Sequence, residues 1–308
     1  MPFNKQTYYE SKQNSRKFMM RKKPMLAYPV SSKPIDYTNK VSMQPKLDGV
    51  RCLIQREPAF PGQPELASFN VKAYSRTGKE WKNIDHILQG LKPFFFNNPD
   101  VILDGELYNH DLKNDFEKII SCVRKQKPTD IQRAESRKLV QFHCYDIVDE
   151  TMTFEDRCNF VFTNLRDAYG VRTVATTKGI CSNDQAHAFH DLYLKDGYEG
   201  SILRLNTEYQ CKRSHSLRKF KDFHDAEAVI TDWVEGKGKR KGTIGKFMAI
   251  DADGNTFGMP VMDNFKKLQT MFKEMQGWVG KEATFTYFER TKANSYRHPL
   301  FKAIRDYE

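Results

Sequence analysis

One six-residue segment, KLDGVR at positions 46–51, constrains the fold of this chain more than any other feature. Apolar residues alternate on both sides of it, so the segment predicts a strand, a tight turn at Gly49 and a second strand. Lys46 then ends a strand, and Arg51 re-enters a sheet where its guanidinium can meet an anion. A lysine in a cleft becomes a covalent nucleophile when burial or cationic neighbours lower its pKa. The alternative is a surface β-turn with ordinary charges.

Charge composition narrows the class of partner. Lys and Arg total 50 against 39 Asp and Glu, a formal net charge of +11. This excess favours a polyanion, with nucleic acid the first candidate and a merely basic protein the alternative. Hydrophobic residues make up 39% of the 308 residues. That is enough for a folded core, and the length exceeds what one core organises, so we expect two domains.

The six cysteines carry no ligand-pair or redox spacing. They lie more than ten residues apart, at Cys52, Cys122, Cys144, Cys158, Cys181 and Cys211. We expect buried, reduced thiols in a cytosol-like compartment. No apolar run approaches the roughly eighteen residues of a membrane span, and the N-terminus has no apolar run typical of a secretory signal, so neither is expected.

Hydrophobic periodicity predicts a mixed α and β organisation. Residues 1–24 hold seven basic side chains and one acid, which indicates either a basic arm that touches phosphates or a solvated tail. The pattern beyond it predicts strands at 43–46, 50–54, 71–75, 101–107, 139–148, 202–205 and 217–223, helices at 84–96, 111–126, 154–169 and 183–196, and a loop at 55–70.

The pattern of expected elements changes after residue 223, where we place the domain boundary. Short strands are expected at 226–234, 244–250, 255–259 and 283–288, with one helix at 263–275. Several short strands with Gly turns in about 85 residues suggest a small β-barrel such as an OB-fold.

Further motifs follow the first in a fixed order: SRTG at 75–78, DGEL at 104–107, EGSILR at 199–204 and KFK at 219–221. Together with KLDGVR they resemble the ordered motifs of the covalent nucleotidyltransferases, and most closely those of ATP-dependent DNA ligases of the compact viral and bacteriophage kind. KPMLA at 23–27, RHPLF at 297–301 and the final Arg305-Asp306 are also typical of DNA ligases. The resemblance covers about residues 23 to 308.

The resemblance implies an α+β fold. It divides the chain into a basic arm at 1–24, an ATP-grasp-like nucleotidyltransferase (adenylation) domain with antiparallel sheets and flanking helices at 25–223, and an OB-fold at 224–308. A hinge near 222–225 would let the OB-fold swing between ATP and DNA.

By the same resemblance, Lys46 is the nucleophile that attacks the α-phosphate of ATP and forms a lysyl–AMP phosphoramidate. Lys219 and Lys221 alternate with Phe220, so on a strand both ammonium groups face one side. There they would counter the α-phosphate charge and lower the pKa of Lys46. The alternative is a solvent-facing lysine pair. Asp48 is implied in the final attack of the 3′-hydroxyl.

The resemblance also implies nucleotide and metal ligands. Glu106 is expected at the ribose or a metal and Glu199 at Mg²⁺, a hard cation that suits carboxylate oxygens and bridges phosphates. Arg76 is expected at the ribose or the nick, and Arg51 at a phosphate of the nucleotide or of the nick. Arg204 is placed among the nucleotide-binding residues.

Two residues are expected at the adenine. Tyr145 occupies the position of the aromatic that stacks on the base, a contact worth about 1–3 kcal/mol in other base-stacking proteins. The alternative is ordinary core packing. Gln44, two residues before Lys46, is expected to read the edge of the base.

The C-terminal region supplies two further groups of cations. Arg297 and Arg305 match arginines that contact the pyrophosphate end of ATP, although the lysine that usually follows the aspartate is missing after Asp306. Residues 236–242 fit no phosphate-loop pattern and lie between strands. We expect a basic hairpin that grips duplex phosphates through Lys237, Lys239, Arg240 and Lys241, with a solvated turn as the alternative.

These expectations define an ATP- and Mg²⁺-dependent DNA ligase that seals nicked duplex DNA in replication, repair or recombination, acting as a monomer without a membrane. The expected place is the cytoplasm, notably of a phage- or virus-infected cell, with the nucleus open. The alternatives are an RNA ligase or mRNA-capping guanylyltransferase of the same superfamily, and a catalytically inactive nucleic-acid-binding protein.

Overall fold

The computed structural model describes residues 22–59, 68–113, 115–165, 169–291 and 294–305. The chain forms two compact units, the first ending at Lys221 and the second beginning at Asp222. Most of the basic arm expected at 1–24 lies outside the described residues, as does Asp306.

The first unit contains two five-stranded sheets. The first sheet has the order β1-β10-β9-β2-β8, in which only β1 and β10 are parallel. Its strands are β1 (Leu26–Pro29), β2 (Val41–Lys46), β8 (Thr177–Lys178), β9 (Gly200–Leu205) and β10 (Arg213–Phe220).

The second sheet has the order β4-β3-β5-β6-β7, in which only β6 and β7 are parallel. Its strands are β3 (Val50–Pro58), β4 (Phe69–Tyr74), β5 (Ile102–Tyr108), β6 (Gln141–Ile147) and β7 (Val171–Thr173). The expected antiparallel sheets are confirmed apart from one parallel pair in each.

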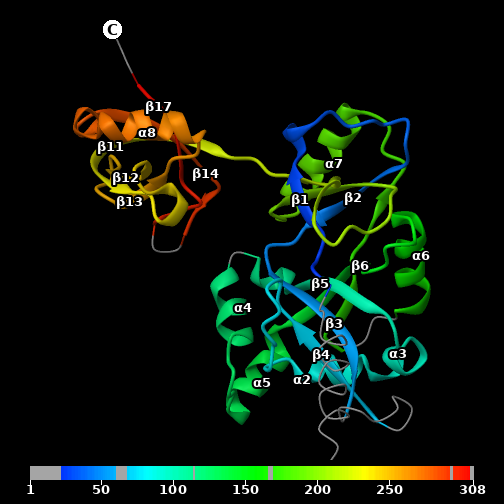
Figure 1. Cartoon of the computed structure of the whole chain (residues 1–308). Coiled ribbons are helices and arrows are strands. Elements are labelled where there is room, and N and C mark those ends of the chain that lie inside the picture. The colour runs from blue at the N-terminus through cyan, green and yellow to red at the C-terminus, as the bar shows by residue number, and fades with distance from the viewer. Residues whose placement is uncertain (1–21, 60–67, 114, 166–168, 292–293, 306–308) are drawn as a thin grey trace, which may run out of the picture. The chain divides into compact units, whose positions relative to one another are not determined.

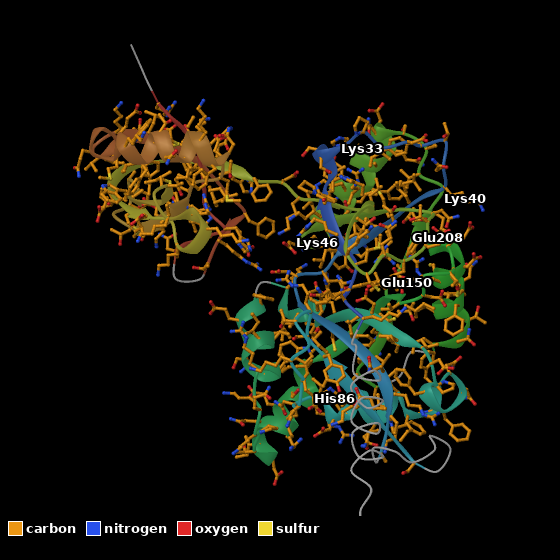
Figure 2. All side chains as sticks on the ribbon, in the orientation of Figure 1. Lys33, Lys40, Lys46, His86, Glu150 and Glu208 are labelled. Carbon is orange, nitrogen blue, oxygen red and sulfur yellow. The ribbon has the colours of Figure 1, made fainter. Side chains whose placement is uncertain are left out.

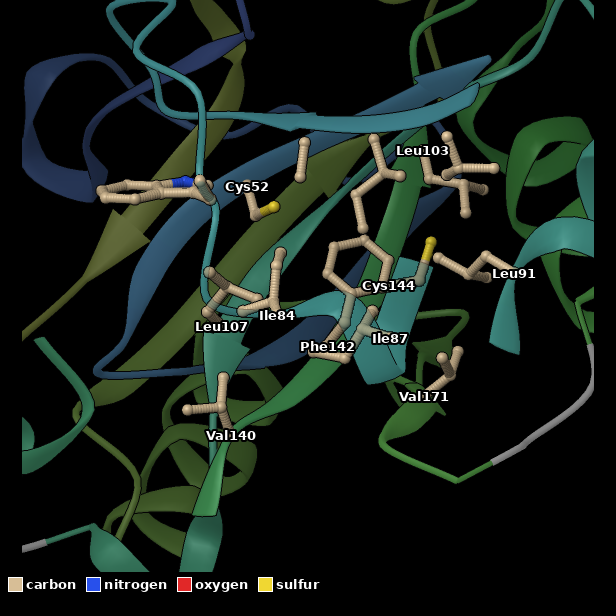
Figure 3. Packing of buried hydrophobic residues seen from close by; sticks show 14 of the residues in the cluster. Cys52, Ile84, Ile87, Leu91, Leu103, Leu107, Val140, Phe142, Cys144 and Val171 are labelled. Atoms are coloured by element: carbon tan, nitrogen blue, oxygen red, sulfur yellow. The ribbon is translucent and has the colours of Figure 1, made fainter. Parts of the chain in front are cut away.

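Helices flank both sheets (Figure 1). They are α2 (Asp85–Gly90), α3 (Lys92–Asn97), α4 (Phe116–Val123), α5 (Asp130–Leu139), α6 (Phe154–Asn164) and α7 (Asn183–Lys195), with single 3-10 turns at Val30–Ser32 and His110–Leu112. The largest core lies between the second sheet and its helices, where Cys52, Ile84 and Phe142 pack together (Figure 3). A smaller core joins α7 to the first sheet through Met43, Ala186 and neighbouring residues.

The helix expected at 84–96 is two helices. It breaks at Leu91, and α3 carries Pro93 in its first turn. A proline has no N–H to donate and fits only the start of a helix, so the apolar period continues across a break in the backbone.

Other expected boundaries also shift. Strand β3 runs to Pro58, well into the expected loop at 55–70, because Gln55 and Arg56 still pair with β4. The helix expected at 111–126 shortens to α4, and the one expected at 154–169 ends at Asn164. The structure adds α5, whose start is marked by a capping box between Thr129 and Gln132.

The second unit contains a five-stranded antiparallel sheet with the order β13-β12-β11-β14-β17, a separate two-stranded sheet of β15 and β16, and one α-helix between β13 and β14. The two outer strands also contact each other, so the sheet curls into the partly open barrel typical of an OB-fold. Phe247 and Phe285 are fully buried at its centre. Its elements are β11 (His224–Glu235), 3-10 turn Gly238–Arg240, β12 (Ile244–Ile250), β13 (Thr256–Pro260), α8 (Phe265–Lys273), 3-10 turn Met275–Trp278, β14 (Glu282–Tyr287), β15 (Glu289–Arg290), β16 (Tyr296–Arg297) and β17 (Leu300–Ile304).

The α+β class with an OB-fold after the larger region is therefore confirmed. In the part of the chain that the structure describes, no helix has the length and apolar character needed to cross a membrane.

Two adjacent phenylalanines of α3 test the core assignment. Phe95 is fully buried and Phe96 is 71% exposed. We expect Phe95→Ala to lower the free energy of unfolding of the first unit by about 3–5 kcal/mol, because it leaves a cavity in the main core. Phe96→Ala is the matched control and should change it by less than about 0.5 kcal/mol. Urea unfolding of both variants makes the measurement, and equal effects would contradict this packing.

Candidate active site

The KLDGVR segment joins the two sheets of the first unit. Lys46 is the last residue of β2 in the first sheet, and Val50 opens β3 in the second. The expected strand, turn and strand are present, but the two strands do not form a hairpin. Gly49 lies so close to β5 that an added Cβ would stand 2.4 Å from the Leu107 carbonyl oxygen. The glycine is therefore required by a close approach of two backbones.

Strand register brings three motifs to one end of the first sheet. Lys46 lies opposite Gly200, and the Glu199 N–H donates to the Lys46 carbonyl at 3.1 Å. Phe220 lies opposite Ser201 on the other side of β9. Gly200 has a φ of +145°, and a Cβ there would stand 2.2 Å from the Phe220 carbonyl oxygen. Glycine at this position lets Glu199 enter between the two neighbouring strands.

The carboxylate of Glu199 holds two ammonium groups. One oxygen pairs with Lys46 Nζ and the other with Lys221 Nζ. Glu199 is 3% exposed, whereas the Lys46 side chain keeps 21% of its surface accessible. Lys46, marked in Figure 2, is therefore the more accessible partner of a buried carboxylate.

Lys219 stands close to the same group of charges. Burial, together with the charges of Lys46 and Arg213, lowers the pKa of Lys219. Phe220, between the two lysines, stacks on His190 of α7 with ring centroids 4.1 Å apart, and His190 contacts the Ser201 hydroxyl at 3.0 Å. Strand β10, which carries Lys219 and is directly followed by Lys221, is thus held in place at this point.

Glu106 and Tyr145 face each other from β5 and β6. The Tyr145 hydroxyl donates to Glu106 Oε2 at 3.2 Å. Burial raises the pKa of Glu106 to about 7, although Arg51 and Lys46 act in the opposite direction. This carboxyl is therefore poised to exchange a proton near neutral pH.

Arg51 is engaged by a carboxylate. Its Nε and Nη2 donate to the two oxygens of Asp104 at 2.6 and 2.5 Å. Asp104 also accepts from the Tyr209 hydroxyl at 2.7 Å. Met25, in the KPMLA segment, donates its N–H to that hydroxyl at 2.7 Å and accepts from Arg51 at 3.1 Å. The predicted role of Arg51 at a phosphate stays a prediction.

A second set of buried charged side chains lies next to Gln44. Arg204 is 4% exposed and donates to Gln44 Oε1 at 2.6 Å and to Asp146 Oδ2 at 2.7 Å. Asp146 also pairs with Arg157 of α6 at 2.7 Å. Arg204 also lies 5.5 Å from the Tyr145 ring centre. In this structure Arg204 contacts protein groups, and its predicted contact with nucleotide stays a prediction.

Two cavities open beside these residues. One of about 830 Å³ is lined by Gln44, Tyr145 and Thr176, among others. The other, of about 1070 Å³, has a basic lining that includes Arg76 and Arg213. Asp48 lies in the turn after Lys46. Burial is the largest cause that raises the pKa of Tyr108, and the charges of Tyr198 and Asp48 raise it further.

The remaining predicted cations belong to the second unit. Arg297 pairs with Glu289 at 2.6 Å, and Arg305 pairs with Glu227. Their predicted role at ATP stays a prediction.

The basic turn at 236–242 lies between β11 and β12. Lys237, Lys239 and Lys241 are exposed, but Arg240 donates to the Val261 carbonyl at 2.8 Å. Arg240 therefore anchors the turn through Val261, and its predicted contact with phosphates stays a prediction.

Sequence reasoning gave no role to several residues of the site. Asp104 opens the DGEL motif two residues before Glu106, and Asp146 directly follows Tyr145 in the strand expected at 139–148. Arg157 shares the buried face of α6 with Phe154 and Val161. A charge on an apolar helical stripe is the signal that could have found it.

No cluster of three or more His, Cys, Asp or Glu side chains in the described ranges could hold a metal by itself. Mg²⁺ commonly uses one or two protein carboxylates together with water and substrate phosphates. The predicted role of Glu199 and Glu106 at Mg²⁺ stays a prediction, and in this structure both oxygens of Glu199 are paired with lysines.

Comparisons with known proteins agree with this geometry. Residues 24–221 match the family model of the ATP dependent DNA ligase domain. A DNA ligase of African swine fever virus is 29% identical over 188 residues, which cover 57% of this chain and 42% of the viral protein. The chain thus spans less than half the length of that relative.

Solved structures share the fold. A structure from a study of Lig E DNA ligases has a TM-score of 0.70 and 22% identity over 93% of this chain and all of the other. The ATP-dependent DNA ligase of bacteriophage T7, solved in complex with ATP, has a TM-score of 0.50 and 16% identity, and covers 93% of this chain and 99% of the other.

The raised pKa of Glu106 predicts a pH-dependent stability. Between about pH 4.5 and 7 the folded state keeps a proton that the unfolded state has lost, so stability falls as pH rises through this window. We expect Glu106→Gln to remove this slope and to gain on the order of 2 kcal/mol relative to the parent by pH 7.5, a value reduced because part of the side chain contacts solvent.

Thermal unfolding of the first unit at pH 4.5, 6 and 7.5 makes the measurement. Glu208→Gln, at an exposed glutamate, is the control and should follow the parent. Parallel pH curves for Glu106→Gln and the parent would show that Glu106 ionises normally.

Proposed function

Because this chain belongs to the family of ATP-dependent DNA ligases, we propose that it seals 5′-phosphate/3′-hydroxyl nicks in duplex DNA through a lysyl–AMP intermediate. The pairing of Glu199 with Lys46 and Lys221 carries this proposal. It puts an accessible amine among fixed cations at the end of a rigid sheet, where a polyphosphate would be held and attacked.

The first step uses the amine of Lys46. Its Nζ forms a bond to the α-phosphorus of ATP, the bond from that phosphorus to the bridging oxygen breaks, and pyrophosphate leaves. Lys46 must first lose a proton and its contact with Glu199. Lys219 and Lys221 stabilise the charge that develops on the α-phosphate. Burial first, and then the charges of Lys46 and Arg213, lower the pKa of Lys219.

The two later steps move AMP to DNA. The 5′-phosphate of the nick attacks the adenylyl phosphorus and releases Lys46; the 3′-hydroxyl then attacks the activated phosphate and expels AMP. We propose that Arg76, on the rim of the basic cavity, contacts DNA at the nick and that Asp48 assists the last attack. All three steps depend on positioning and on charge stabilisation.

Mg²⁺ is proposed as the metal, held by Glu199 and Glu106 together with phosphate oxygens. When bound it would neutralise phosphate charge and orient the triphosphate. Glu106 is also proposed at the ribose, and Tyr145 at the face of the adenine ring.

The second unit is proposed to hold duplex DNA. The loop between the first two strands of an OB-fold is one of its usual nucleic-acid contacts. Here that loop presents the exposed Lys237, Lys239 and Lys241. Arg297 and Arg305 are proposed to leave their carboxylate partners and meet the pyrophosphate end of ATP.

We propose that the protein works as a monomer in a reducing compartment such as the cytoplasm. Each unit has a core of its own, and all six cysteines are unpaired with one another.

Replacement of the nucleophile tests the first step. With ATP and Mg²⁺ the parent should gain the mass of one AMP on the peptide that contains Lys46. Lys46→Ala should gain none, yet should bind DNA with the same salt dependence. The control is Lys40→Ala, at a surface lysine paired with Glu155, and it should be labelled like the parent. An AMP adduct on Lys46→Ala would identify another nucleophile, and labelling by GTP in place of ATP would indicate a capping guanylyltransferase.

The basic turn can be tested by salt dependence. A triple change of Lys237, Lys239 and Lys241 to Ala should reduce the slope of log K against log salt by up to about 2.7, since each lost phosphate contact removes about 0.9. A triple change with equal loss of charge at ion-paired surface lysines, Lys40, Lys118 and Lys267, is the control. An equal reduction in both would place the DNA elsewhere.

A further inference from the structure

The amide of Gln44 is fixed by three hydrogen bonds. Its side chain lies on β2, two residues before Lys46, and is 2% exposed. Nε2 donates to the Tyr145 carbonyl at 3.1 Å and to Thr176 Oγ1 at 2.8 Å. Oε1 accepts from Arg204 Nε at 2.6 Å.

These partners permit only one orientation of the amide. A guanidinium can only donate, and a backbone carbonyl can only accept. If the amide of Gln44 were inverted, its NH₂ would face the N–H of Arg204 and its oxygen would face the Tyr145 carbonyl. The position of Oε1 therefore follows from the chemistry of its neighbours and does not depend on telling O from N.

Arg204 cannot easily leave this position. Its Nη1 pairs with Asp146 at 2.7 Å, and Asp146, with none of its surface exposed, is bound on its other side by Arg157. Arg157 also donates to the carbonyls of Met152 at 2.7 Å and Thr207 at 3.0 Å. Withdrawal of Arg204 would leave a buried carboxylate with one partner fewer, which is costly.

What Gln44 can still offer is an acceptor. An amide nitrogen has two hydrogens, and both are used here; an amide oxygen has two lone pairs, of which one is used. Gln44 also lines the cavity of about 830 Å³ together with Tyr145 and Thr176. A purine with an amino group at position 6 brings an N–H to such an acceptor. A 6-oxo purine brings an oxygen, and the two oxygens repel.

We propose that Arg204 is a positioning residue that keeps Gln44 Oε1 as a hydrogen-bond acceptor and so makes the site prefer 6-amino over 6-oxo purine nucleotides. Asp146 and Arg157 act with it by holding the guanidinium in place. This inference rests on the proposed function, because it concerns the base of the nucleotide that Lys46 attacks.

The test compares equilibrium binding of ATP and ITP, which differ in the ring by the group at position 6. All variants carry Lys46→Ala and are measured without Mg²⁺, so that no adduct forms. With Arg204 present, ATP should bind about tenfold or more tightly than ITP, since a buried acceptor facing an oxygen loses a hydrogen bond. A glutamine at position 204 can also accept a hydrogen bond, so Arg204→Gln tolerates an inverted Gln44 amide. This variant should lower the ratio of ATP affinity to ITP affinity at least threefold. Arg204→Lys remains a pure donor and should keep the ratio.

Thr176→Val is the matched control. It removes a contact on the donor side of Gln44, where the Tyr145 carbonyl still orients the amide, so both nucleotides should weaken equally. If Arg204→Gln does not fold, Gln44→Met replaces it, because it leaves the Arg204–Asp146 pair intact and should abolish the preference. A ratio within twofold of the parent in either substituted protein overturns the proposal. Loss of ATP binding in the Lys46→Ala protein itself would instead contradict the proposed function.

Discussion

A carboxylate shared by two ammonium groups is the interaction on which this site depends. Strand order and register in the first sheet bring Lys46 and Lys219, with Lys221 directly after β10, to one end of the sheet, where three positive charges would repel one another. Glu199 enters between them because Gly200 lets the backbone pass close to Phe220. The carboxylate offsets the charges of Lys46 and Lys221, one on each oxygen. The backbone conformation at Gly200 therefore allows both the close strand packing and the placement of the Glu199 carboxylate.

Close to this end of the sheet, two groups of ion pairs lie in the interior of the first unit. Asp104 holds Arg51, and Asp146 holds Arg204 and Arg157. Buried charges are costly unless they are paired and hydrogen-bonded, and these groups fulfil that condition through hydroxyl and carbonyl partners. Their strict donor and acceptor pattern gives neighbouring side chains one allowed arrangement, which apolar packing would not do.

Much of this could be predicted from the sequence because strands and motifs are local signals. The KLDGVR turn, the strand at 139–148 that carries Tyr145 and the succession of short strands after residue 223 each depend on a few adjacent residues. Partners across the chain could not be predicted: nothing near Arg51 indicates that Asp104 binds it, and nothing near Arg240 indicates Val261. The break at Leu91 was hidden because the apolar period continues through it.

The attachment of the KPMLA segment has a consequence of its own. Met25 reaches the Arg51 and Tyr209 side chains through its main-chain N–H and C=O. These main-chain hydrogen bonds do not depend on which side chain residue 25 carries. The Met25 side chain itself packs in a small core with Leu217. Other apolar residues can therefore replace Met25 without loss of these two main-chain hydrogen bonds. Proline has no amide hydrogen and would remove the bond to the Tyr209 hydroxyl.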